Sequence, residues 1–213
     1  ISIMTGGPGV GKTTACKAIV SIALEAGLRI ELCAPTARAA KRLAEATGQN
    51  ARTIHRLLEP NPAVRGEAGA MTFLRNATNP LDVDLVIVDE TSMVDVVLMA
   101  ALVQAIPNGA RLVFVGDPDQ LPPVGPGAPF RDMIASGTIP VTRLTQIHRQ
   151  AEGSAIVRMA HGIMRGIQGL ANLVSVPGNR SNGCLHIVSV APDSVRETVI
   201  AMVRDAEEDF QCD

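Results

Sequence analysis

Short apolar runs alternate with longer amphipathic segments through the first 150 residues of the chain. The apolar runs, which we expect to form buried strands, span residues 1–4, 28–33, 85–88, 112–115 and 141–145. Between them, periodicity and capping residues predict helices at 14–26, 37–47, 92–106 and 130–136, with a short helical turn at 53–58. This alternation predicts βαβ units, and therefore an α/β fold with a mostly parallel sheet flanked by helices.

Two regions depart from this pattern. Residues 59–80 hold three prolines and two glycines with little periodicity, which predicts an irregular connection. Beyond residue 150 we expect an amphipathic helix at 154–165, a linker at 166–183, and one more strand and helix at 185–190 and 193–205. Because a lone strand and helix cannot bury a core, we interpret residues 1–150 as one domain, 151–183 as a helix and linker, and 184–213 as the opening of a second domain.

A glycine-rich segment from Gly6 to Thr13 fits the phosphate-loop pattern G-x-x-x-x-G-K-[ST], between a predicted strand and a predicted helix. Its glycines allow successive backbone N–H groups to surround a phosphate, and the start of the helix adds a favourable field. Lys12 can reach the β- and γ-phosphates, and Thr13 can ligate Mg²⁺. The residues predicted to bind a nucleotide are Gly7, Pro8, Gly9, Val10, Gly11, Lys12, Thr13 and Thr14. The alternative is a glycine-rich turn without a ligand.

Two further segments place polar residues directly after predicted strands. Asp89 and Glu90 follow the run at 85–88, and Gln120 lies within GDPDQLPPVG. Functional groups gather at the carboxyl ends of parallel strands, so Asp89 is a candidate Mg²⁺ ligand and Glu90 a candidate general base for the attacking water. Gln120 can sense a γ-phosphate without adding charge. The alternatives are two solvated acids that cap the next helix, and a plain proline-rich turn.

Composition narrows the possible functions. The net charge of −2 gives no general support for nucleic-acid binding, and aromatic residues are only 2% of the chain, so a base-stacking platform is hardly available. The four cysteines form no C-x-x-C pair, which argues against a zinc site and a disulfide framework. Without a signal peptide or about 18 consecutive apolar residues, we expect a soluble, cytoplasmic protein with no membrane partner. The sequence begins at Ile1, and we expect a piece of a longer polypeptide.

Six motifs occur in order along the chain: GGPGVGKTT, APTARAAKRL, ARTIHRLL, VIVDETSMVD, GDPDQLPPVGPG and LTQIHRQ. Together they closely resemble motifs I, Ia, Ib, II, III and IV of superfamily 1 DNA helicases, specifically the RecD-like group of the 1B branch. The resemblance covers roughly residues 1–165. It implies that residues 1–150 form the first RecA-like P-loop NTPase motor domain, 1A, and that residues 184–213 begin the second. The implied activity is ATP-driven translocation along single-stranded DNA in the 5′→3′ sense.

The resemblance also assigns roles and ligands. Gln120 matches the γ-phosphate sensor of motif III, and Arg149 matches the motif IV arginine that neutralises transition-state charge, a role that suits a guanidinium. Taken without the family, Arg149 would be a surface arginine. The implied cofactors are ATP and Mg²⁺, and the implied partners are single-stranded DNA and a second RecA-like domain of the same polypeptide. Motifs V and VI, and the glutamine element that recognises adenine, would lie outside residues 1–213.

A set of residues in motifs Ia, Ib and III matches positions where family members touch DNA. These candidates are Pro35, Thr36, Arg38, Thr53, His55 and Val124. Arg38, Lys41, Arg42, Arg52 and Arg56 make this part of the chain locally basic, which suits phosphate contacts. A solvated helix face is the alternative explanation of the same charges.

Two other functions stay open at this stage. One is a P-loop phosphotransferase that acts on a small molecule, although the sequence lacks the arginine-rich lid expected of one. The other is an ATP-gated binding subunit that does not translocate. The complete set of Lys12, Asp89, Glu90, Gln120 and Arg149 argues against a motor that has lost its activity.

Overall fold

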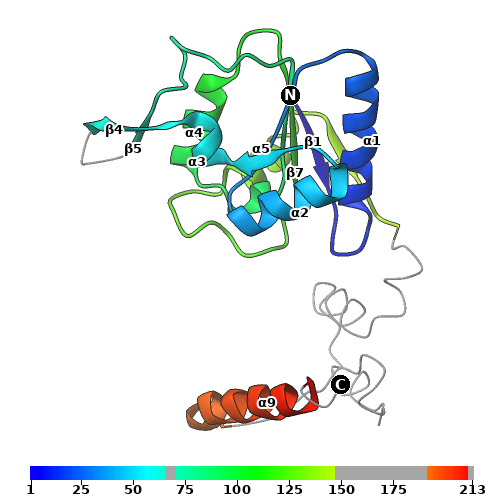
Figure 1. The fold of residues 1–213 in the computed structure, drawn as a ribbon, viewed down its shortest axis with the longest axis vertical. Coiled ribbons are helices and arrows are strands. Elements are labelled where there is room, and N and C mark those ends of the chain that lie inside the picture. Colours follow the sequence, from blue (N-terminus) through cyan, green and yellow to red (C-terminus); the bar gives the residue numbers. More distant parts are fainter. Residues whose placement is uncertain (66–70, 147–190, 211–213) are drawn as a thin grey trace. The chain divides into compact units, whose positions relative to one another are not determined.

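The computed structural model describes residues 1–65, 71–146 and 191–210 (Figure 1). Its contacts divide the chain into two units, Ile1–Gly153 and Ser154–Asp213. In the second unit, the 3₁₀ turn η3 (Pro192–Ser194) leads into helix α9 (Val195–Phe210), which confirms a helix in the predicted region. The helix and strand predicted at 154–165 and 185–190 lie outside the described residues. Among the described residues, no helix is long and apolar enough to cross a membrane.

The first unit is built on a six-stranded parallel sheet with the order β3-β2-β6-β7-β1-β8. Its strands are β1 (Ser2–Thr5), β2 (Ile30–Ala34), β3 (Ala51–Thr53), β6 (Leu85–Val88), β7 (Arg111–Gly116) and β8 (Val141–Arg143). The predicted α/β fold is therefore confirmed. Strand β3 was not predicted, because three residues at a sheet edge are too short to carry a hydrophobic period.

Helices cover both faces of the sheet (Figure 1). One face packs against α3 (Ile54–Leu58), α4 (Val96–Ala105) and α5 (Pro129–Ser136), and the other against α1 (Lys12–Glu25) and α2 (Ala37–Thr47). Alternation within β6 divides its side chains, since Val86 and Val88 join the first core cluster while Leu85 and Ile87 join the second. The continuous apolar run at 85–88 thus follows from burial on both faces.

The helix predicted at 92–106 is interrupted. Its first part is a separate 3₁₀ turn, η2 (Thr91–Met93), and α4 begins only at Val96. The break occurs because Asp95 is extended and its carboxylate accepts a hydrogen bond from the Leu98 N–H at 2.8 Å, which caps α4. The interruption leaves η2 free to pack across the end of β7, beside the acidic pair.

The irregular connection predicted at 59–80 is wrong in part. Strands β4 (Pro60–Arg65) and β5 (Met71–Phe73) form a separate antiparallel hairpin with an irregular register, which projects from the body of the unit (Figure 1). Prolines are tolerated here because an isolated hairpin has edges that need no N–H donor. Its base is fixed by the Arg75–Glu59 ion pair at 3.0 Å and by a hydrogen bond from the Leu74 N–H to the Glu59 carbonyl at 2.8 Å.

Candidate nucleotide site

The phosphate loop joins β1 to α1 in a conformation that only its glycines permit. Gly9 and Gly11 have φ angles of 77° and 87°, in the left-handed region. Gly6 passes so close to the residue that follows β8 that an added Cβ would lie 2.5 Å from the Leu144 carbonyl oxygen. Val10 is buried, so its side chain does not stand on the surface of the loop. The exposed residues at the tip of the loop are Pro8 and Gly9.

Lys12 lies at the start of α1 and folds back over the loop. Its Nζ donates hydrogen bonds to the carbonyl oxygens of Gly6 and Gly7, at 2.6 and 2.9 Å. Thr13 and Thr14 are exposed in the first helical turn, which contains no acidic residue and has no side-chain cap. The first turn thus presents unpaired N–H groups and a positive field, which suit an anion such as a phosphate.

The two acids predicted from motif II follow β6 at the carboxyl edge of the sheet. The Asp89 N–H donates to the Cys33 carbonyl at 2.9 Å, and the Asp89 carboxylate accepts the Glu90 N–H at 2.9 Å. Glu90 has a φ of 51°, an uncommon value for a residue that is not glycine. Such strained backbone clusters at functional sites, where the surroundings hold it in place.

Lys12, Asp89 and Glu90 act on one another electrostatically. Burial raises the pKa of Asp89, against the opposing influence of its hydrogen bond from Glu90 and of the Lys12 charge. Burial also raises the pKa of Glu90, and the Asp89 charge raises it further. The Cys16 thiol, buried within α1, has its pKa raised to about 12 by burial and by Asp89, with Lys12 opposing. The phosphate-loop lysine and the acidic pair therefore belong to one charged site.

Asp117 and Arg42 complete this charged site, and the sequence analysis gave neither a role in it. Asp117 directly follows β7, is 2% exposed, and accepts a hydrogen bond from the Asp119 N–H at 3.1 Å. Its charge raises the pKa of Glu90, whereas Arg42 on α2 lowers it. The signal for Asp117 was present in the sequence, since this acid follows a buried strand in the same way as Asp89 does.

Three buried side-chain oxygens have no hydrogen-bond partner within the described part of the chain: Thr5 Oγ1, Glu90 Oε2 and Ser92 Oγ. All three follow or end strands β1 and β6, at the edge of the sheet that carries the phosphate loop and the acids. An unpaired buried polar group costs about 1–3 kcal/mol, and native structures retain few of them. For Thr5 and Glu90, this position fits a site whose remaining partners come from a bound ligand, and hard carboxylate and hydroxyl oxygens suit Mg²⁺.

We expect the raised pKa of Glu90 to make stability depend on pH. Below the pKa that the Glu90 carboxyl has in the unfolded state, this carboxyl is protonated in both states. As pH rises towards its higher pKa in the folded state, the carboxyl loses its proton first in the unfolded chain. The free energy of unfolding should therefore fall across this window. Glu90→Gln removes this titration, so the variant should become increasingly more stable than the wild type as pH rises.

Urea unfolding from pH 4.5 to 8, without divalent cations, measures this difference. Glu25→Gln, at the exposed end of α1, is the matched control and should leave the profile unchanged. Repulsion between the two carboxylates is reciprocal, so Glu90→Gln also relieves Asp89, which adds to the expected difference with the same sign. A gap between wild type and Glu90→Gln that stays constant with pH would contradict the expectation.

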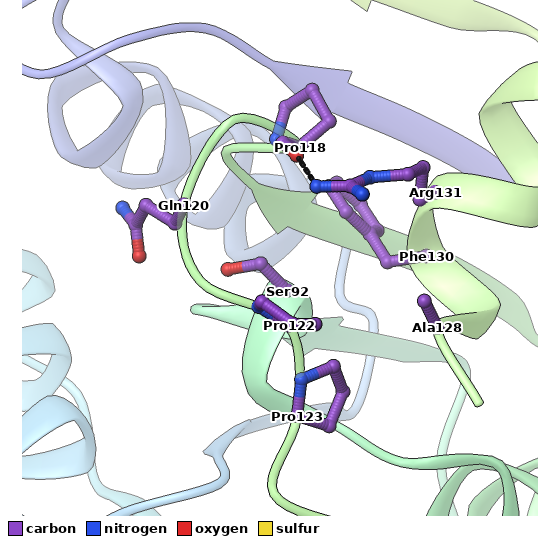
Figure 2. Close-up of a pocket in the computed structure, with 8 residues that line it drawn as sticks. All are labelled: Ser92, Pro118, Gln120, Pro122, Pro123, Ala128, Phe130 and Arg131. Carbon is purple, nitrogen blue, oxygen red and sulfur yellow. Dashed lines mark hydrogen bonds between the residues drawn. The ribbon is translucent and has the colours of Figure 1, made fainter. Parts of the chain in front are cut away.

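Of the two residues predicted to contact the γ-phosphate or the transition state, Gln120 is among the described residues and Arg149 is not. Gln120 is exposed in the loop after β7, and its N–H donates to the Asp117 carbonyl at 3.2 Å. The loop is proline-rich, as the sequence suggested, and it lies against Ser92 of η2 and against α5 (Figure 2). Gly127, near the end of the loop, lies against Val96 at the start of α4. Arg149 lies outside the described residues.

The DNA-binding candidates lie at the carboxyl ends of β2 and β3 and in the loop after β7. Thr36 and Thr53 cap helices, since their hydroxyls accept the N–H groups of Ala39 and Arg56, each at 3.2 Å. Residues Ala34 and Thr53 are register partners in the parallel sheet, so the segments that begin with Pro35 and Ile54 leave it side by side. Arg38 is exposed on α2.

The other two candidates differ in their surroundings. The His55 ring packs at 5.9 Å from the ring of Phe73, which connects α3 to the hairpin and gives this histidine a structural contact. Val124 is fully exposed, and Leu121 beside it in the same loop is 86% exposed. The loop after β7 thus presents apolar side chains to solvent next to the charged site.

Comparison with known proteins places the chain in a family. Residues 1–186 match the family model described as an AAA domain. The chain is 40% identical over 205 residues to the ATP-dependent RecD2 DNA helicase of Deinococcus radiodurans, an alignment that covers 95% of this chain and 26% of that protein. It is 35% identical to the RecBCD enzyme subunit RecD of Mycolicibacterium smegmatis, over 94% of this chain and 39% of the relative. The chain therefore spans only about a quarter to two fifths of these relatives.

A solved structure agrees with the fold. The crystal structure of the Pif1 helicase from Candida albicans is similar with a TM-score of 0.54 and 24% identity, over 76% of this chain and 40% of that one. This likeness supports the RecA-like P-loop NTPase fold that the motifs implied. With the order of its motifs and the extent of its similarity to RecD and RecD2 proteins, the chain belongs to the AAA domain family and to the RecD-like group of superfamily 1B helicases.

Proposed function

We propose that this chain is the ATP-binding and hydrolysing motor domain, 1A, of a DNA helicase that moves 5′→3′ along single-stranded DNA. One observation carries the proposal: the phosphate loop, the acidic pair and the loop with Asp117 and Gln120 meet at one edge of the sheet, and the described unpaired buried oxygens gather at that edge. One of the two relatives named above, RecD2, is an ATP-dependent DNA helicase by name, and it supplies the class of reaction.

Each residue of the site then has a chemical task. Backbone N–H groups of residues 7–14 would hold the phosphates, while Lys12 exchanges its bonds to the Gly6 and Gly7 carbonyls for bonds to the β- and γ-phosphates. Thr13 and Asp89 would hold Mg²⁺, which supplies neutralisation of the phosphate charge when it is bound. A bound cation would also lower the cost of keeping Asp89 and Glu90 charged side by side.

Glu90 is the proposed general base. Its raised pKa makes the carboxylate a better proton acceptor than an ordinary glutamate, and its left-handed backbone fixes its position against the Asp89 carboxylate. Gln120 would contact the γ-phosphate from the next loop, and Arg149 would neutralise charge in the transition state. Both roles rest on the family motifs.

Single-stranded DNA would cross the ends of β2 and β3 and reach the loop after β7. Arg38 can contact phosphates there, Pro35, Thr36, Thr53 and His55 can position the backbone, and Val124 offers an exposed apolar contact to a base or sugar. With few aromatic residues available, this interface would bind through phosphates and aliphatic contacts. A second RecA-like domain of the same polypeptide, beginning near residue 184 after a helix and linker at 151–183, would close on the nucleotide.

An ATPase assay with and without single-stranded DNA tests the proposal, on a polypeptide that carries both motor domains. We expect hydrolysis to be stimulated at least tenfold by DNA, because strand binding should favour the closed, catalytic arrangement. Residues 1–213 alone should bind Mg-nucleotide, hydrolyse it slowly and separate no strands. Hydrolysis that DNA does not stimulate would instead support an ATP-gated subunit that does not translocate.

A further inference from the structure

The loop after β7, which carries Gln120, packs against the segment that follows β6. Gly116 at the end of β7 lies so close to η2 that an added Cβ would be 3.2 Å from the Ser92 nitrogen and 3.0 Å from the Phe130 ring. Further along, the Val96 N–H donates to the Pro126 carbonyl at 3.0 Å, and Gly125 lies against the Asp95 carboxylate. The loop with Gln120 is therefore seated on the segment that follows the acidic pair.

Hydrogen bonds hold the backbone at both ends of this loop, whereas the Gln120 side chain has none among the described residues. At the start, the Arg131 guanidinium donates to the Pro118 carbonyl at 2.8 Å (Figure 2). The Gln120 N–H donates to the Asp117 carbonyl. The Gln120 side-chain amide makes no hydrogen bond to any residue that the structure describes. The backbone of Gln120 is thus fixed, and only the orientation of its amide is left open.

Ser92 supplies a matching unpaired group. Its hydroxyl is one of the three unpaired buried oxygens, and the residue lines a small cavity of about 10 Å³ together with Gln120, Pro122 and Phe130. Figure 2 shows the Ser92 oxygen turned toward the side of the loop that carries Gln120. The other lining groups are apolar, apart from Arg131, whose guanidinium is already bonded. A cavity of this size holds at most about one water molecule.

We propose that Ser92 is a positioning residue for Gln120, which rests on the proposed sensing of the γ-phosphate by Gln120. When a triphosphate binds, the Gln120 amide turns so that its side-chain carbonyl oxygen accepts a hydrogen bond from the Ser92 hydroxyl. That bond fixes the orientation of the amide, so that its NH₂ group, the donor end, faces the γ-phosphate. Because Ser92 is two residues from Glu90, the same contact links the sensor to the proposed general base through η2.

The Met93 N–H donates to the Glu90 carbonyl at 3.1 Å and the Thr91 hydroxyl donates to the Val88 carbonyl at 2.9 Å, so η2 is held to the end of β6. A displacement of the Gln120 loop would therefore also displace Glu90 through η2, and a displacement of Glu90 would move Ser92. The Ser92 hydroxyl, which is unpaired in the free protein, would thus gain a hydrogen-bond partner when a nucleotide is bound.

The test is calorimetric titration of residues 1–213 with Mg-ADP and with the Mg-bound β,γ-imido analogue of ATP. The measured quantity is the ratio of the two affinities, which reports sensing of the γ-phosphate. We expect Ser92→Ala to reduce the preference for the triphosphate about tenfold, the effect of losing one hydrogen bond to a group that contacts a charge. Gln120→Ala should reduce it at least as much, and the double variant no further than Gln120→Ala alone.

Thermal unfolding separates positioning from a structural role. Ser92→Ala removes an unpaired buried hydroxyl, so the free protein should be no less stable than wild type, and affinity for Mg-ADP should be unchanged. Ser21→Ala, exposed on α1, is the matched control and should alter neither quantity. An unchanged affinity ratio in Ser92→Ala, additive effects of the two substitutions, or equal loss of affinity for both nucleotides with lower stability would each overturn the proposal.

The proposed function can fail separately. If Gln120→Ala leaves the affinity ratio unchanged while Lys12→Ala still abolishes binding, the nucleotide site stands, and the sensing role falls together with that of Ser92. If wild-type residues 1–213 bind neither nucleotide, the proposed function itself is overturned. A reduced ratio in Gln120→Ala alone overturns only the role of Ser92.

Discussion

Replacing Lys12 by alanine is expected to abolish binding of Mg-nucleotide by residues 1–213. In the free protein the ammonium group is held over the phosphate loop by the Gly6 and Gly7 carbonyls, where it is placed to receive phosphate oxygens. Each charge-assisted hydrogen bond contributes about 1.5–3 kcal/mol, so losing two phosphate contacts should weaken binding by about a hundredfold or more. Calorimetric titration with Mg-ATP measures the loss.

The matched control for this substitution is Lys17→Ala. Lys17 is exposed on the same helix, so the variant has the same change in net charge and helix propensity without a change in the loop. Thermal unfolding of both variants checks that the fold is intact. Binding by Lys12→Ala within threefold of wild type would contradict the site, and with it the assignment of the loop to phosphate binding.

The second large effect is expected for Glu90→Gln in a polypeptide that carries both motor domains. A positioned general base contributes about 10²–10⁴-fold to a rate, so single-turnover phosphate release should slow by that factor. Binding of Mg-ATP should be retained or strengthened, because the substitution removes one negative charge from a site where Asp89 and Asp117 already raise the pKa of Glu90. The two effects have opposite directions, which general unfolding cannot produce.

Phosphate release and nucleotide affinity must be measured on the same preparation. Glu25→Gln, outside the charged site, should leave both unchanged. Phosphate release by Glu90→Gln within threefold of wild type would show that another group accepts the proton. Asp117 would then be the first alternative, since it is buried and acts on Glu90, and Asp89 already has the proposed task of holding Mg²⁺.

Local patterns predicted most of the sheet and its helices. All four residues at 85–88 are apolar, which predicts a strand that is buried on both faces. Helix α2 begins after Thr36 and ends before Gly48, as capping rules require. The phosphate loop was predictable for the same reason, since backbone angles closed to other residues force glycine at fixed positions. These features depend on interactions between residues that are close in sequence.

Features that depend on distant contacts were missed or only partly predicted. Strand β3 exists because β2 offers it an edge, and the β4–β5 hairpin is held by contacts between Glu59 and residues 74–75, fifteen or more positions along the chain. The break before α4 reflects competition between a continuous apolar helix and the Asp95 cap, which the packing of Pro126 and Gly125 favours. Hydrophobic periodicity along the sequence does not predict contacts between such distant residues.

The spacing of residue types along the chain was enough to identify the class of chemistry, because a phosphate loop and an acid pair after a buried strand each need particular residues at particular positions. The order of the strands could be known only from the folded chain, in which β7 lies between β1 and β6 and Asp117 joins Lys12, Asp89 and Glu90. The same holds for the packing of Ser92, with its unpaired hydroxyl, against the Gln120 loop. The physical reason is that strand order and the seating of loops are set by packing between segments far apart in the chain, whereas motifs report only neighbours.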